Sequence, residues 1–106
     1  GLALSSRNQY LSVEDRAEAP SLYRMLNQVR DAIQSDVAHA AENLHALEEK
    51  AVAELTEHGW KPDYVAVRRQ HDLLEPTPEQ VRAGEPLVIL AAARLGTTRL
   101  IDNLEI

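Results

Sequence analysis

The sequence predicts an α+β domain, in which a small antiparallel three-stranded sheet packs against two main helices. Three observations support this fold class. Between residues 20 and 58 apolar side chains recur at steps of three and four, which is the period of a helix that buries one face. After Gly59 the pattern changes to alternation and continuous apolar runs, which are typical of strands. The chain has 106 residues, of which 44% are hydrophobic, and this supports one domain with its own core.

The first main helix is expected near residues 20–35. Pro20 suits the first turn of a helix, where its missing N–H is not needed, and a shorter helical piece starting at Ser12 is expected before it. Ser35 and Asp36 are a plausible break. The helix carries one apolar stripe, made of Leu22, Met25, Leu26, Val29 and Ile33.

The second main helix is expected near residues 40–58. It ends at His58 and Gly59, because glycine readily takes the left-handed conformation that follows a helix. Its buried face is predicted to hold Leu44, Leu47, Ala51 and Leu55. Its acidic side chains are expected to form a solvated outer face, namely Glu42, Glu48, Glu49 and Glu54.

The second half of the chain predicts three strands. Residues 64–67 form a short β-branched run, and residues 79–81 are expected to make one helical turn after a proline-containing connector. Residues 87–93 are apolar at every position, so they are predicted to form the central strand, covered on both faces. A turn at residues 95–98 then leads into a partner strand at 99–104.

Composition narrows the classes of function. The formal net charge is −6, which argues against a general nucleic-acid or anionic-membrane binder, because both need dense Lys and Arg. There are no cysteines, so disulfides, thiolate metal sites and a cysteine nucleophile are excluded. The longest apolar run is too short to span a bilayer. No signal peptide is recognised at the start, so a cytoplasmic location is expected.

The histidines do not predict a metal site. His39 and Glu42 lie one helical turn apart and could supply two ligands. Without a third ligand, that spacing more often marks a solvated helix face. We therefore expect no metal bound by this chain alone.

The amino-terminal run is the remaining candidate for chemistry. It contains in succession two hydroxyls, a guanidinium and an amide, carried by Ser5, Ser6, Arg7 and Asn8. Hydroxyls donate short hydrogen bonds and the planar guanidinium offers a fork of donors, so this group suits phosphate oxygens. The alternative is an ordinary solvated chain start.

Both ends of the chain carry longer motifs. Residues 1–12, which read Gly-Leu-Ala-Leu-Ser-Ser-Arg-Asn-Gln-Tyr-Leu-Ser, closely resemble the segment that opens the C-terminal domain of the pantothenate synthetase (pantoate–β-alanine ligase) family. Residues 90–103, from Leu-Ala-Ala-Ala-Arg-Leu-Gly-Thr-Thr to Arg-Leu-Ile-Asp-Asn, resemble the closing signature of that family. Residues 62–65 match its first strand of this domain. The resemblance therefore spans essentially the whole chain, in the right order.

The resemblance implies an activity for the parent protein. Family members are cytoplasmic homodimers of pantothenate and coenzyme A biosynthesis. They use ATP and Mg²⁺ to form pantoyl adenylate from pantoate, with release of pyrophosphate, and β-alanine then displaces AMP. The family's phosphate loop, often Met-Ser-Ser-Arg, falls here on Leu4, Ser5, Ser6 and Arg7, and leucine is a conservative replacement for the methionine.

The resemblance also implies what this chain lacks. The Rossmann-like N-terminal domain, which in the family binds most of ATP, Mg²⁺, pantoate and β-alanine, does not precede residue 1. Residues 1–106 are thus expected to be a single domain, with residues 1–11 as the phosphate-loop segment and no catalytic residue of their own. The isolated domain is expected to be inactive. The alternative is a free-standing protein-interaction module without catalytic activity.

Overall fold

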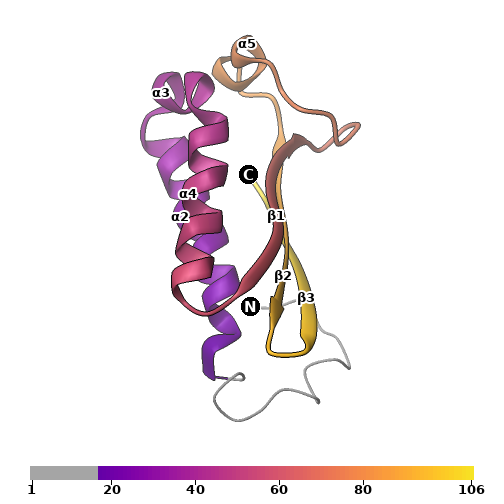
Figure 1. Ribbon diagram of the computed structural model, residues 1–106. Helices are drawn as coiled ribbons and strands as arrows, with labels where there is room; N and C mark the ends of the chain where they lie inside the picture. Colours follow the sequence, from indigo (N-terminus) through magenta and orange to yellow (C-terminus); the bar gives the residue numbers. More distant parts are fainter. Residues whose placement is uncertain (1–16) are drawn as a thin grey trace.

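The computed structural model of the chain describes residues 17–106. The part of the expected short helix at residues 12–16 lies outside the described residues. The helices α2, α3 and α4 stand together on one side of a single sheet, and α5 lies near one end of it (Figure 1). The elements are α2 Pro20–Ser35, α3 Val37–Glu42, α4 Leu44–Glu57, β1 Lys61–Arg69, α5 Pro78–Arg82, β2 Leu87–Leu95 and β3 Thr98–Glu105.

The sheet has three antiparallel strands in the order β1-β2-β3, so the prediction of a central strand at 87–93 is confirmed. The prediction of a hairpin is also confirmed, because Leu95 of β2 pairs with Thr98 of β3 across a two-residue turn. Gly96 has a φ of 63° at the first central position, a place where the turns favoured in such hairpins accept glycine.

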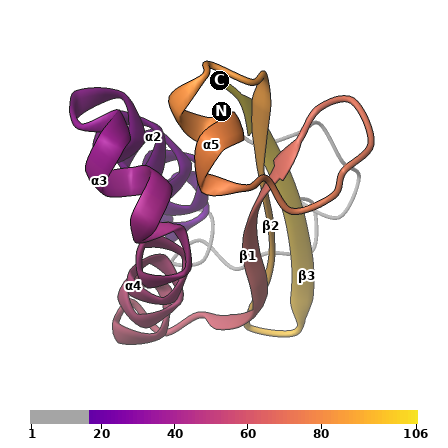
Figure 2. The same cartoon turned by 90° about the horizontal axis from the view of Figure 1, so that it is seen from above.

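The core lies between the sheet and the helices. All five apolar side chains predicted on α2 are buried. Alternate residues of β2 face them, namely Leu87, Ile89, Ala91, Ala93 and Leu95. Viewed from above, the helices lie on the same side of the sheet (Figure 2), so this face of β2 is the one they cover. The α+β fold class and the three-stranded sheet are therefore confirmed.

The prediction of one continuous helix at 40–58 is wrong, because this region contains two helices. The chain re-enters helix already at Val37, since the Asp36 carboxylate accepts a hydrogen bond from the His39 N–H at 3.1 Å. At Asn43 the backbone leaves helical geometry (φ −126°, ψ 27°), and its side-chain amide donates to the His39 carbonyl at 2.9 Å. This competition for a backbone carbonyl is what asparagine does within helices. None of the helices in residues 17–106 is long and apolar enough to cross a membrane.

The prediction that Glu48 belongs to a solvated outer face is also wrong. Glu48 is only 9% exposed and lies among the buried residues of α4. Its Oε2 accepts a 2.8 Å hydrogen bond from the Val67 N–H of β1, and Arg68 Nη1 lies 3.6 Å from the same oxygen. Because β1 is an edge strand, Glu48 satisfies a backbone donor that has no neighbouring strand to pair with.

Replacing Glu48 tests this bond. Glu48→Ala leaves the Val67 N–H without its acceptor, and we expect the free energy of unfolding to fall by about 1–3 kcal/mol. Glu48→Gln retains an acceptor oxygen and should lose less. Glu49→Ala, on the exposed side of the same helix turn, is the matched control and should change stability by less than about 0.5 kcal/mol. Urea denaturation followed by circular dichroism measures all three, and equal losses for Glu48→Ala and Glu49→Ala would contradict the bond.

Candidate functional site

The residues predicted to bind ATP phosphates, Leu4, Ser5, Ser6 and Arg7, lie outside the described residues. Residues 17–106 contain four features with polar side chains that are candidates for a site. They are a groove between two helices, a histidine between two glutamates, a turn after β1, and a buried carboxylate on β3.

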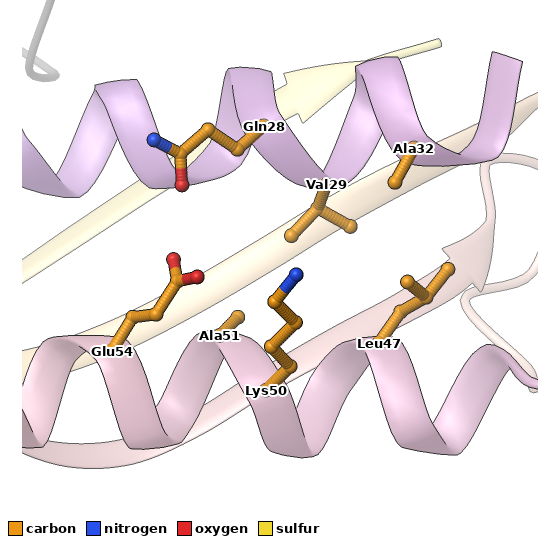
Figure 3. Close-up of a pocket in the computed structure, with 7 residues that line it drawn as sticks. All are labelled: Gln28, Val29, Ala32, Leu47, Lys50, Ala51 and Glu54. Carbon is orange, nitrogen blue, oxygen red and sulfur yellow. The ribbon is translucent and has the colours of Figure 1, made fainter. Parts of the chain in front are cut away.

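The groove lies between α2 and α4 and encloses about 320 Å³. Its floor consists of small and apolar side chains, and Figure 3 shows Val29 and Ala51 there, facing each other from the two helices. Three polar side chains, Gln28, Lys50 and Glu54, also line it, and Figure 3 shows those of Lys50 and Glu54 directed from α4 towards α2. They comprise one cation, one anion and one amide, which do not define a preference for a charged ligand.

His45 on α4 lies between two carboxylates. Its Nδ1 is 2.9 Å from Oε1 of Glu48, and its Nε2 is 2.6 Å from Oε1 of Glu75 in the segment after β1. Glu48 is held in turn by the Val67 N–H. The three groups therefore connect α4, β1 and the segment that leads to α5.

This group was not found from the sequence. Glu75 is distant in the chain and reaches His45 only through the fold, although the i, i+3 spacing of His45 and Glu48 was a visible signal. Its three potential ligand atoms lie within 4.8 Å of one another, but each ring nitrogen already contacts a carboxylate. The residues considered earlier for a metal have other contacts: His39 lies beside Asn43, and Glu42 accepts a 2.8 Å hydrogen bond from Arg82 of α5.

The turn after β1 is held by an ion pair. Arg69 Nε donates to Asp72 Oδ1 at 2.9 Å, and its Nη2 contacts Oδ2. The Leu74 backbone N–H and the Arg69 side chain together lower the pKa of Asp72. The contribution of Asp72 to stability is therefore present above the pKa it has in the unfolded chain, and is lost as the pH falls through the lower folded value. Arg69 thus stabilises the turn through its ion pair with Asp72.

The buried carboxylate belongs to Asp102 on β3. The residue is only 5% exposed, and burial raises its pKa because the charged form loses its water. Oδ1 accepts a 2.8 Å hydrogen bond from the Asn103 N–H.

A side-chain contact joins the two edge strands at the hairpin end of the sheet. There Arg99 of β3 donates a hydrogen bond to Asp63 of β1 at 2.7 Å.

The fold and these polar contacts describe the kind of domain that the chain forms. The chain is a small α+β domain in which several charged side chains of the described residues join different elements, as Arg82 of α5 does with Glu42 of α3 and Arg99 of β3 with Asp63 of β1. The family model of pantoate–beta-alanine ligase matches residues 1–105, and the chain belongs to that family.

Solved structures agree with this assignment. Two crystal structures of pantothenate synthetase from Thermus thermophilus are each 40% identical to the chain, with a TM-score of 0.71. Each match covers 99% of this chain and 35% of the solved one. The chain therefore corresponds in length to about a third of these relatives. The predicted resemblance to the family is confirmed.

Proposed function

We propose that this chain is the C-terminal domain of an ATP-dependent ligase that condenses pantoate and β-alanine to pantothenate through a pantoyl-adenylate intermediate. One observation carries the proposal: the family match extends from residue 1 to residue 105 and so includes the Leu4–Arg7 run. The domain would contribute the ATP-phosphate loop and act as a lid over the nucleotide. The Rossmann-like part, absent from residues 1–106, would supply the remaining pockets.

The chemistry of adenylate formation suits these residue types. Pantoate carboxylate attacks the α-phosphate in line, the bond to the β-phosphate breaks, and pyrophosphate leaves with the electron pair. Catalysis of such a displacement consists mostly of positioning and of stabilising negative charge. Arg7 would bind the leaving phosphates through its guanidinium, Ser5 and Ser6 would donate to their oxygens, and Leu4 would support the loop or contact the nucleotide.

ATP and Mg²⁺ would be held mainly by the rest of the ligase. Mg²⁺ takes carboxylate, phosphate and water oxygens. The grouped carboxylates within residues 17–106, those of Glu48 and Glu75, both contact His45, so they do not fit a dedicated Mg²⁺ site. Several described arginines pair with carboxylates, for example Arg82 with Glu42. The resemblance of residues 4–7 to the family's phosphate loop makes these residues the proposed phosphate donors of this domain. The same proposal includes that the parent enzyme is a homodimer and that it is located in the cytoplasm.

The 106-residue chain alone should form no pantothenate from ATP, pantoate and β-alanine, yet it should unfold cooperatively. Adenylation needs the pantoate carboxylate held against the α-phosphate, and this domain would supply only phosphate contacts. The assay is chromatographic detection of pantothenate, with the full-length ligase as the positive control, beside a thermal melt of the chain. Product above the blank from the highly purified chain would refute its dependence on a partner domain.

The alternative function, a protein-interaction module, has one observation in its favour. Tyr64 of β1 and Ile101 of β3 are 41% and 49% exposed, and both are opposite Ala92 in the register of the sheet. They thus lie on the face that the helices do not cover. The length of the parent reading frame separates the two functions. A frame that continues upstream by a nucleotide-binding domain supports the ligase, and one confined to this domain supports the module.

A further inference from the structure

The two ring contacts of His45 require two donors. Its Nδ1 lies 2.9 Å from Glu48 Oε1, and its Nε2 lies 2.6 Å from Glu75 Oε1. An ionised carboxylate only accepts hydrogen bonds, and a neutral imidazole carries one N–H and one lone pair. While both carboxylates are ionised, both contacts are hydrogen bonds only if the ring is protonated and donates from each nitrogen. The arrangement is therefore that of an imidazolium between two carboxylates.

The two carboxylates are not held equally firmly. The Glu48 side chain is 11% exposed, and its Oε2 accepts the Val67 N–H at 2.8 Å and lies 3.6 Å from Arg68 Nη1. The Glu75 side chain is 49% exposed, and its ion pair among the described residues is the one with His45. A ring with a single proton leaves a lone pair facing one carboxylate, which is unfavourable. Glu75 can move into water, whereas Glu48 is fixed by the strand, so the remaining proton should stay on Nδ1.

Glu75 has open space in which to move. It lines, together with His45, a hollow of about 320 Å³ beside the start of α4. Glu42 of α3 lines the same hollow, but its carboxylate accepts a 2.8 Å hydrogen bond from Arg82 of α5 and is already paired. Glu49, one helical turn after His45, is exposed on α4. A Glu75 side chain that leaves the ring therefore meets water, and its place is not taken by a described carboxylate that lacks a partner of its own.

We propose that His45 and Glu75 form a proton-dependent latch between α4 and the segment that joins β1 to α5. The protonated ring holds both glutamates; when it loses one proton, the bond to Glu48 persists and Glu75 leaves Nε2. The latch is closed at about pH 5.5 and open at about pH 8.5, because histidine changes its charge between about pH 5 and 8. Pro76 is buried, so the segment stays attached beside the released side chain. The latch does not depend on the ligase assignment.

The first test is the nitrogen-15 spectrum of the His45 ring in the 106-residue chain at these two pH values. At the lower pH both ring nitrogens should have the chemical shifts of protonated nitrogens. At the higher pH only Nε2 should move to the range of an unprotonated nitrogen, with the proton kept on Nδ1. A solvated neutral imidazole favours the opposite tautomer, so an ordinary exposed histidine gives a different spectrum. An unprotonated Nδ1 at the higher pH overturns the proposal.

The second test follows the Glu75 side chain by nuclear Overhauser contacts. Contacts between the ring protons of His45 and the γ protons of Glu75 are expected at the lower pH and should be lost at the higher one, while those to Glu48 remain. Glu79→Gln, which neutralises an exposed carboxylate on α5, is the matched control and should leave this loss unchanged. His71→Gln removes the other histidine near Glu75 and should also leave it unchanged. Glu75 contacts that persist at both pH values, or a loss that disappears in His71→Gln, overturn the latch.

Discussion

Arg7→Ala in the full-length ligase is expected to lower kcat of pantoyl-adenylate formation roughly 10²–10³-fold, equivalent to about 3–4 kcal/mol. The reason is that negative charge grows on the leaving pyrophosphate, so the guanidinium contact would be stronger in the transition state than with bound ATP. The substitution should therefore reduce kcat more than it weakens ATP binding. Single-turnover formation of the adenylate, measured at several ATP concentrations, separates the two effects.

Arg7→Lys is the matched variant for this prediction. An ammonium keeps the positive charge but cannot reproduce the bidentate fork, so it should recover only part of the lost rate. Thermal melts of both variants should stay close to wild type, because the proposed role of Arg7 is in phosphate binding. An Arg7→Ala enzyme that forms adenylate at the wild-type rate contradicts the role, and a slow enzyme with a collapsed melting temperature makes the role structural instead.

Trp60→Ala is expected to destabilise the domain by about 3–5 kcal/mol. Trp60 is 2% exposed and is among the largest fully buried side chains of the core. It follows Gly59, whose φ of 87° turns the chain from α4 towards β1. Removing the indole would leave a cavity where the helices meet the sheet, and it would also remove the Nε1–H that Glu18 accepts. Urea denaturation followed by far-ultraviolet circular dichroism measures the change.

Two further variants show which part of Trp60 matters. Trp60→Phe keeps most of the buried ring but lacks the donor, so it should lose clearly less stability than Trp60→Ala. Leu74→Ala removes an apolar side chain that is 59% exposed, and it should change the free energy of unfolding by less than about 0.5 kcal/mol. If Trp60→Ala were as mild as Leu74→Ala, the tryptophan would not be part of the core.

The sequence predicted α2 and β2 correctly, because the burial of each element can be recognised from its own run of residues. The stripe on α2 reflects burial of one helix face, which leaves a helical period in the sequence, and the continuous apolar run of β2 reflects burial of both faces of a central strand. The break at Asn43 and the burial of Glu48 depend instead on the contacts of a single polar side chain, that of Asn43 with the His39 carbonyl and that of Glu48 with Val67, Arg68 and His45. A glutamate beside an apolar stripe has the same sequence signature whether water or a strand N–H binds it.

Some residues of the candidate site could likewise be selected from the sequence, and others could not. Leu4–Arg7 could be selected because donors suited to phosphate stand next to one another in the chain, and the match over residues 1–105 supports the family that this motif indicated. The roles of these four residues remain predictions. Glu75 and Asp102 could not be selected, because Glu75 reaches His45 only through the fold and the burial of Asp102 depends on what packs over β3.

The two-residue turn between β2 and β3 has a consequence for the order in which the domain folds. Pairing across Gly96 closes a very short loop, whereas pairing β1 with β2 must first close the connection through residues 70–86. Short loops close with less entropy loss, and local contacts form faster. We therefore expect the β2–β3 hairpin to form before β1 docks, and the contact of Glu48 with Val67 of β1 to form later. Destabilising substitutions in the turn should slow folding, whereas Glu48→Ala should mainly accelerate unfolding.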